Sequence, residues 1–234
     1  MPYLIFAAAL AFAISPFLSP EFGGFDADRF PVPQDNPPGQ PAGYAFGIWG
    51  VIYLWLIVGT GFQALKRREA RDWAALRGPL LVSLVVGIAC LPVALSSPIW
   101  ATVLIWIMWG GAVTALARSP RRDVMFGAAP IGLYAGWLTA ASCVSLALLS
   151  AGYGLLDETT AALVALVIAL VLTSSVMRLR PDVISYPAAV VWALIAVAVA
   201  NWGGGPPSVL MLAIVGAVLV AALGVLNWVR ARND

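Results

Sequence analysis

The sequence predicts an all-α fold, a polytopic transmembrane helix bundle with about eight spans, and three observations lead to that prediction. Hydrophobic residues make up 62% of the 234 residues and charged residues only 10%, with a mean hydropathy of +0.93. A soluble domain carries about 25% charged residues, so this composition is typical of an integral membrane protein. The other two observations are the lengths of the apolar runs and the distribution of basic residues between them.

Eight apolar runs are close to the ~20 residues that a membrane-spanning helix needs. They cover residues 3–19, 45–65, 78–96, 99–117, 125–150, 160–178, 184–202 and 207–228. The first run lacks the basic region and the clear cleavage site of a signal peptide, so we interpret it as a helix. Only "SSP" separates the third and fourth runs, which predicts a tight helical hairpin.

The basic residues predict the orientation of the spans. With the N-terminus in the cytoplasm, cytoplasmic connections and the C-terminal tail hold 12 of the 13 Lys and Arg residues, and only Arg29 lies outside. Acidic residues gather on the outer side, at Glu21, Asp26, Asp28, Asp35, Asp157 and Glu158. This bias predicts an even number of spans with both termini cytoplasmic.

Several function classes are disfavoured. No charged residue lies well inside a span, which argues against a proton-coupled pump and against a retinal protein with its Schiff-base Lys. The chain has no His, the commonest metal and haem ligand, and no metal-ligand spacing, so we expect no required cofactor. Cys90 and Cys143 are predicted to be reduced core residues. The few, scattered basic residues predict no nucleic-acid partner.

The connection from residue 19 to residue 43 is the only long one. It holds six prolines, which stiffen it, and four glycines, which let it turn sharply. Because it runs directly into an aromatic cluster, we interpret it as a lid over a binding site; a plain linker is the alternative.

The second span places aromatic side chains on one helical face. Phe46, Trp49 and Tyr53 follow a 3, 4 spacing, and Gly50 leaves room beside them, while Trp55 points the opposite way. The glycines at 43 and 47 are four residues apart, a spacing that permits close contact with another helix. Tight bundle packing is the alternative interpretation of these aromatics.

The fifth span carries a second aromatic stripe. Tyr134 and Trp137 are three residues apart, and the small residues Ala141 and Ser145 continue their face. Large rings above small residues can hold a flat hydrophobic ligand, with the Tyr hydroxyl and Trp N–H as polar groups. Thr139 and Ser142 are expected to bond back to carbonyls of their own helix.

The remaining tryptophans allow two interpretations. In the fourth span, Trp106 and Trp109 are three residues apart and either complete an aromatic cage or face lipid. The tryptophans near predicted span ends are expected to lie in the interfacial aromatic belt; they are Trp73, Trp100, Trp202 and Trp228.

Three stretches of these spans resemble the motifs of one family. The first stretch comprises Pro41, Gly43, Tyr44, Phe46, Trp49 and Tyr53. The third span ends in Ser97, Pro98 and Ile99, and the fifth contains Tyr134, Trp137, Ala141 and Val144. Together they are similar to the P-x-G-W-x-F-x-x-x-W-x-x-L-Y, W-S-P-L-F-F and P-Y-x-x-W-x-x-F-A-x-x-L-N motifs of the TspO/MBR family, the translocator or tryptophan-rich sensory proteins. Tyr44 replaces a Trp of that pattern, and Ser145 replaces an Asn.

The resemblance implies a TspO-like five-helix membrane core over residues 1–150, with the long first loop at 19–43. Residues 151–234 then form three additional transmembrane helices, in a protein of the bacterial inner membrane. It also implies a pocket for a porphyrin-type ligand under the first loop. The expected ligand-binding residues are Tyr44, Phe46, Trp49, Tyr53, Trp106, Trp109, Tyr134, Trp137, Ala141 and Ser145.

Three function hypotheses follow. The first is a membrane receptor or carrier for a flat hydrophobic ligand such as a tetrapyrrole. The second is an enzyme that degrades porphyrins in light, although acid–base residues for catalysis are absent from the spans. The third is a structural or assembly subunit of a larger membrane complex, and a homodimer is a further alternative.

Overall fold

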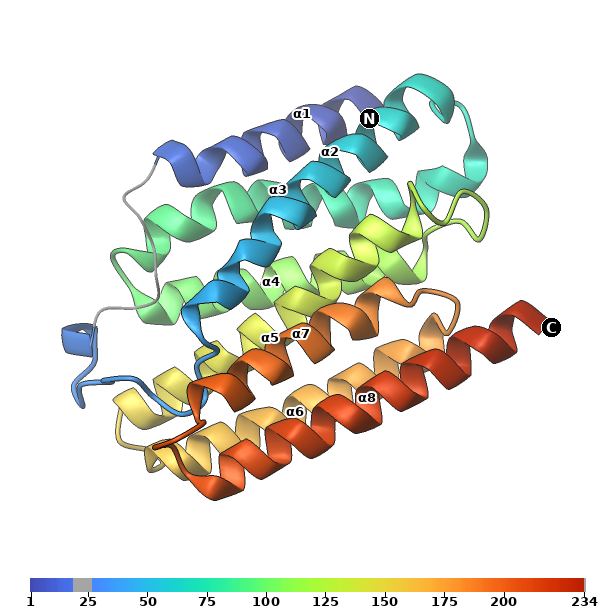
Figure 1. Ribbon diagram of the computed structural model, residues 1–234. Coiled ribbons are helices and arrows are strands. Elements are labelled where there is room, and N and C mark those ends of the chain that lie inside the picture. Colours follow the sequence, from blue (N-terminus) through green and yellow to red (C-terminus); the bar gives the residue numbers. More distant parts are fainter. Residues whose placement is uncertain (19–26, 234) are drawn as a thin grey trace.

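The computed structural model describes residues 1–18 and 27–233, and within those ranges it contains helices and no strand (Figure 1). The elements are α1 Pro2–Ile14, η1 Ser15–Leu18, η2 Ala27–Arg29, η3 Gly43–Gly47, α2 Ile48–Lys66, η4 Arg71–Trp73, α3 Ala74–Ala94, α4 Pro98–Ala117, α5 Ala128–Gly152, α6 Glu158–Leu179, α7 Ser185–Ala200 and α8 Pro207–Asn233. The predicted all-α bundle is confirmed. Residues 19–26 of the predicted first span and loop lie outside the described residues.

In the described residues, eight α-helices correspond in position to the eight predicted spans. In the described part of the chain, six segments are long and apolar enough to cross a membrane, and they contain α2, α3, α4, α5, α6 and α8. The segments Pro2–Leu18 and Ser185–Ala200 are apolar but shorter. At ~1.5 Å per residue, the 16 residues of α7 extend about 24 Å, less than the ~30 Å of a bilayer core.

α5 is the central helix of the bundle. It packs against α2, α4, α6 and α7, and most of its side chains are buried. Small residues make this possible, since Gly132 and Gly136 face α7 so closely that a Cβ at Gly136 would collide with the carbonyl of Tyr186. Gly59 of α2 meets the chain at Phe126 in the same way. Such glycine contacts replace the hydrophobic driving force that is absent between helices in lipid.

Both termini lie at one end of the bundle, together with the α2–α3, α4–α5 and α6–α7 connections (Figure 1). We call this the basic end. Here Arg67 pairs with Asp123 at 2.7 Å, and Arg180 pairs with Asp182 at 2.7 Å. Hydrogen bonds from these guanidinium groups lower the pKa of both carboxyl groups. Arg180 is buried and also donates to the carbonyls of Leu116, in the last turn of α4, and Ser119, in the α4–α5 connection, so it ties the α6–α7 connection to the end of α4.

Two local expectations were wrong. Nothing lies within 4 Å of a Cβ built at Gly43 or Gly47, so the close helix contact that their spacing permits, and that tight packing of this span would use, is not made there. In an all-apolar span the sequence does not distinguish a lipid-facing glycine from a packed one. Trp73 is buried rather than interfacial, because η4 turns its ring onto Phe62, 6.0 Å away between ring centroids. Trp100 and Trp202 are exposed.

Candidate functional site

A cavity of about 640 Å³ lies in the half of the bundle away from the basic end. Its walls come from the end of α1, the start of α2, the end of α3, the start of α4, the second half of α5, the first half of α6 and the second half of α7. Ligand pockets commonly measure about 300–1,000 Å³, so this cavity is large enough for a drug-sized molecule.

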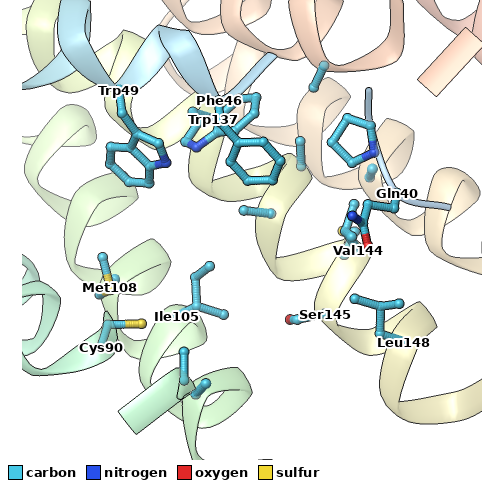
Figure 2. Close-up of a pocket in the computed structure, with 18 of the residues that line it drawn as sticks. Gln40, Phe46, Trp49, Cys90, Ile105, Met108, Trp137, Val144, Ser145 and Leu148 are labelled. Atoms are coloured by element: carbon cyan, nitrogen blue, oxygen red, sulfur yellow. The ribbon is translucent and has the colours of Figure 1, made fainter. Parts of the chain in front are cut away.

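Aromatic rings form one part of the cavity wall, which we call the aromatic wall: Phe12, Phe46, Trp49, Tyr53 and Trp137. Trp49 and Tyr53 stack with centroids 5.2 Å apart, and Phe46 meets Trp137 edge-on at 5.9 Å (Figure 2). Phe12 approaches Tyr53 edge-on at 5.1 Å. The rings therefore support one another, and their orientation is set before a ligand binds.

Six of the ten predicted site residues line this cavity: Phe46, Trp49, Tyr53, Trp137, Ala141 and Ser145. The helical spacing brings this about, because residue 46 of η3 and residues 49 and 53 of α2 share one face where η3 runs into α2, while 137, 141 and 145 share one face of α5. The structure thus brings the predicted faces of the second and fifth spans to one cavity.

The other four predicted residues do not line the cavity. Tyr44 is half exposed and packs edge-on against Trp192, with centroids 5.5 Å apart. Tyr134 is fully buried one layer behind the cavity. Trp106 and Trp109 lie together at 5.2 Å on α4, away from the cavity.

Sequence reasoning missed several lining residues. Phe12 lies in α1, where uniform apolarity gives no signal for a functional face. Cys90 and Cys143, predicted as core, both line the cavity (Figure 2 labels Cys90). α6 and α7 also contribute, and here the spacing of small residues at 162, 165 and 169 was the available signal.

The segment before η3 covers the cavity, because Gly39, Gln40 and Pro41 are part of its lining. Figure 2 shows the Gln40 side chain beside Val144 of α5. Gly39 fits closely over the helices, since a Cβ there would lie 3.4 Å from the methyl groups of both Ala147 and Ala162.

Hydrogen bonds fix this covering segment to the ends of α5 and α7. The Asn201 side chain donates to the Pro38 carbonyl at 2.9 Å, and the Ala42 N–H donates to the Ala196 carbonyl at 3.1 Å. Earlier in the loop, the Val32 N–H donates to the Gly152 carbonyl at 2.9 Å. The described part of the first loop is therefore docked on the bundle.

The cavity is apolar. Among its described lining residues none is charged, and the polar side chains are few, such as Gln40, Tyr53 and Ser145. The Ser145 hydroxyl is already used, since it donates to the Ser142 carbonyl at 2.8 Å. No group of His, Cys, Asp and Glu within the described ranges could hold a metal ion. This arrangement suits stacking and apolar packing of a ligand.

Comparison with known proteins identifies the family. The family model described as TSPO-like protein matches residues 38–226, a range that begins in the covering segment and ends within α8. No curated protein and no solved structure matches the chain. The matched range covers well over half of the sequence, and the eight apolar helices agree with a multi-pass membrane protein, so the chain belongs to the TSPO-like protein family.

Proposed function

We propose that this protein is a membrane receptor or carrier for a flat hydrophobic ligand of the porphyrin class. The observation that carries the proposal is the cavity with its aromatic wall beneath the docked segment 38–43. A flat conjugated ring stacks on aromatic side chains, and each contact contributes about 0.5–1.5 kcal/mol beyond burial of area.

The chemistry of the cavity supports binding more than catalysis. Its described lining has no charged residue and no imidazole to act as a general acid or base. A free-base porphyrin needs no axial ligand, which agrees with a chain that lacks His. The proposed setting is the bacterial inner membrane, with both termini in the cytoplasm and the covered cavity in the outer half of the bilayer.

A titration tests this function directly. Protein purified in mild detergent should shift the absorption band of protoporphyrin IX in a saturable manner. Replacing Trp137 with Leu should raise the Kd roughly tenfold, because lost stacking of about 1.4 kcal/mol corresponds to that factor.

Trp55→Leu is the matched control on the neighbouring helix. The Trp55 indole donates to the Met125 carbonyl at 2.9 Å and does not line the cavity. The Trp55→Leu substitution should leave the Kd for protoporphyrin IX within about twofold of the wild-type value. Absence of saturable binding to the wild-type protein would contradict the proposed function. A loss in Trp55→Leu without a loss in Trp137→Leu would place the site elsewhere.

A further inference from the structure

Two of the last three helices, α6 and α7, together form one wall of the cavity. α6 supplies Ala162, Ala165, Leu166 and Ala169, and α7 supplies Val190, Ala193, Leu194 and Val197. Both sets follow the same i, i+3, i+4, i+7 spacing, so each helix turns one continuous face to the cavity. We call these eight residues the aliphatic wall.

The aliphatic wall differs chemically from the aromatic wall. It contains no ring and no polar side-chain atom, and all eight residues are buried. Its four alanines leave space where larger side chains would fill it, and aliphatic surfaces of this kind pack well against flexible hydrocarbon. The aromatic wall instead presents flat faces and edges that suit a conjugated ring.

The absence of charge in the described lining limits the ligand further. A carboxylate inside this cavity would lose its hydration without gaining a cation as partner, which costs several kcal/mol. The portion of the ligand that enters must therefore be neutral, as an ester is.

We infer that the ligand of this cavity is a neutral, flat conjugated ring that carries an aliphatic chain, with the ring on the aromatic wall and the chain on the aliphatic wall. This inference rests on the proposed function and specifies its substrate class. It also gives α6 and α7 a role, since they complete the binding site and select for the chain.

Three derivatives of one ring separate the effects of charge and chain. Pyropheophorbide a has a single carboxyl group; its methyl ester is neutral without a chain, and its decyl ester is neutral with one. We expect the methyl ester to bind roughly tenfold more tightly than the free acid, and the decyl ester roughly tenfold more tightly than the methyl ester. Affinities are measured in nanodiscs and corrected for partition into lipid, because lipid also solvates the chain.

Variants assign the chain to its wall. Ala165→Phe should weaken binding of the decyl ester more than binding of the methyl ester, and should therefore remove the preference for the decyl ester. Val164→Phe is the matched control, since Val164 is the preceding residue of α6 and is exposed on its outer face. Trp137→Leu should weaken both esters equally. If Ala165→Phe fails to fold, Ala165→Leu should reduce the preference in the same direction.

The outcomes distinguish this inference from the proposed function. If the wild-type protein binds the esters but shows no preference for the decyl chain, or if Ala165→Phe and Ala165→Leu both retain that preference, the inference is overturned while the receptor function stands. Tighter binding of the free acid than of the methyl ester would also overturn it. If neither ester nor protoporphyrin IX binds saturably, the proposed function itself is wrong.

Discussion

At the scale of single residues, two buried hydroxyl groups organise the layer behind the cavity. Thr139 donates its only hydroxyl hydrogen to the Ala135 carbonyl at 2.9 Å, so its oxygen must accept from both Trp109 Nε1 and the Tyr186 hydroxyl, each at 2.9 Å. Likewise, Ser83 donates to the Met108 carbonyl, which makes Tyr134 the donor in the Ser83–Tyr134 bond. The Thr139 hydroxyl oxygen thus joins α4, α5 and α7. The Ser83 hydroxyl oxygen joins α3, α4 and α5.

These networks predict that two near-isosteric substitutions will lower the free energy of unfolding by unequal amounts. Thr139→Val leaves two buried donors without this acceptor, so it should destabilise the protein by roughly 2 kcal/mol. Tyr134→Phe removes one donor and leaves Ser83 bonded to Met108, so it should cost only about 1 kcal/mol. Unfolding in SDS measures both, and a larger cost for Tyr134→Phe would refute the assigned donor directions.

Sequence reasoning reached part of this layer. The bond of Thr139 to its own helix was predicted and is confirmed. The same prediction for Ser142 was wrong, because its hydroxyl donates to the Ile105 carbonyl of the neighbouring helix α4 at 3.5 Å. Its role as acceptor for Trp109 and Tyr186 could not be predicted, since these partners are 30 and 47 residues away and nothing local indicates which faces meet. For the same reason, the sequence could not predict that Tyr134 lies behind the cavity although it shares a helical stripe with Trp137.

At the scale of elements, the covering segment depends on the end of α7. Asn201 follows the last residue of α7 and holds the Pro38 carbonyl, while it also donates to the Val197 carbonyl at 2.8 Å. The sequence predicted a lid from its prolines and glycines. It did not predict this anchor, because the two partners are 163 residues apart.

Loosening that anchor should speed ligand release. Asn201→Leu removes the hydrogen bond to Pro38, and the loss of about 1.4 kcal/mol should raise the off-rate of protoporphyrin IX roughly tenfold. Stopped-flow displacement gives the rate. Trp202→Ala, at the next and exposed position, should leave it unchanged. Equal off-rates for wild type and Asn201→Leu would mean that the segment does not limit release.

The close contact between Gly136 of α5 and the Tyr186 carbonyl of α7 predicts a loss of stability when a side chain is added there. Gly136→Ala would push its methyl group against the carbonyl of Tyr186, so it should cost about 1–3 kcal/mol through overpacking. Gly110→Ala is the control, since nothing lies within 4 Å of a Cβ there. Because Ala favours the helix, this control should be neutral or stabilising by up to about 1 kcal/mol. Similar losses in both variants would argue against specific packing at Gly136.

At the scale of the whole molecule, the two halves of the bundle differ in packing. Glycines at 59, 111, 132 and 136 bring helices into close contact toward the basic end. Beyond them the same helices surround the cavity with small and aromatic side chains. The number and approximate limits of the helices could be predicted from apolar runs. The participation of α6 and α7 was not predicted, because spans that are apolar on every side give little sign of which face meets a cavity, and the small residues at 162, 165 and 169 of α6 were the signal available.

The positions of the basic residues predict the orientation of the protein in the membrane. The basic end carries both termini, and 12 of the 13 Lys and Arg residues lie in the connections and helix ends that meet there. Segments rich in Lys and Arg are typically retained in the cytoplasm, so we predict that the basic end is cytoplasmic. Asp35, in the first loop, and Met125, in the α4–α5 connection, are both exposed. These two connections lie at opposite ends of the bundle (Figure 1). In intact cells, a membrane-impermeant maleimide should label Asp35→Cys, whereas Met125→Cys should react only after permeabilisation. The native Cys90 and Cys143 line the cavity within the spans, and the unsubstituted protein gives their background. The reversed labelling pattern would place the covered cavity toward the cytoplasm. Labelling of both variants in intact cells would contradict the three crossings, by α2, α3 and α4, that are predicted between residues 35 and 125.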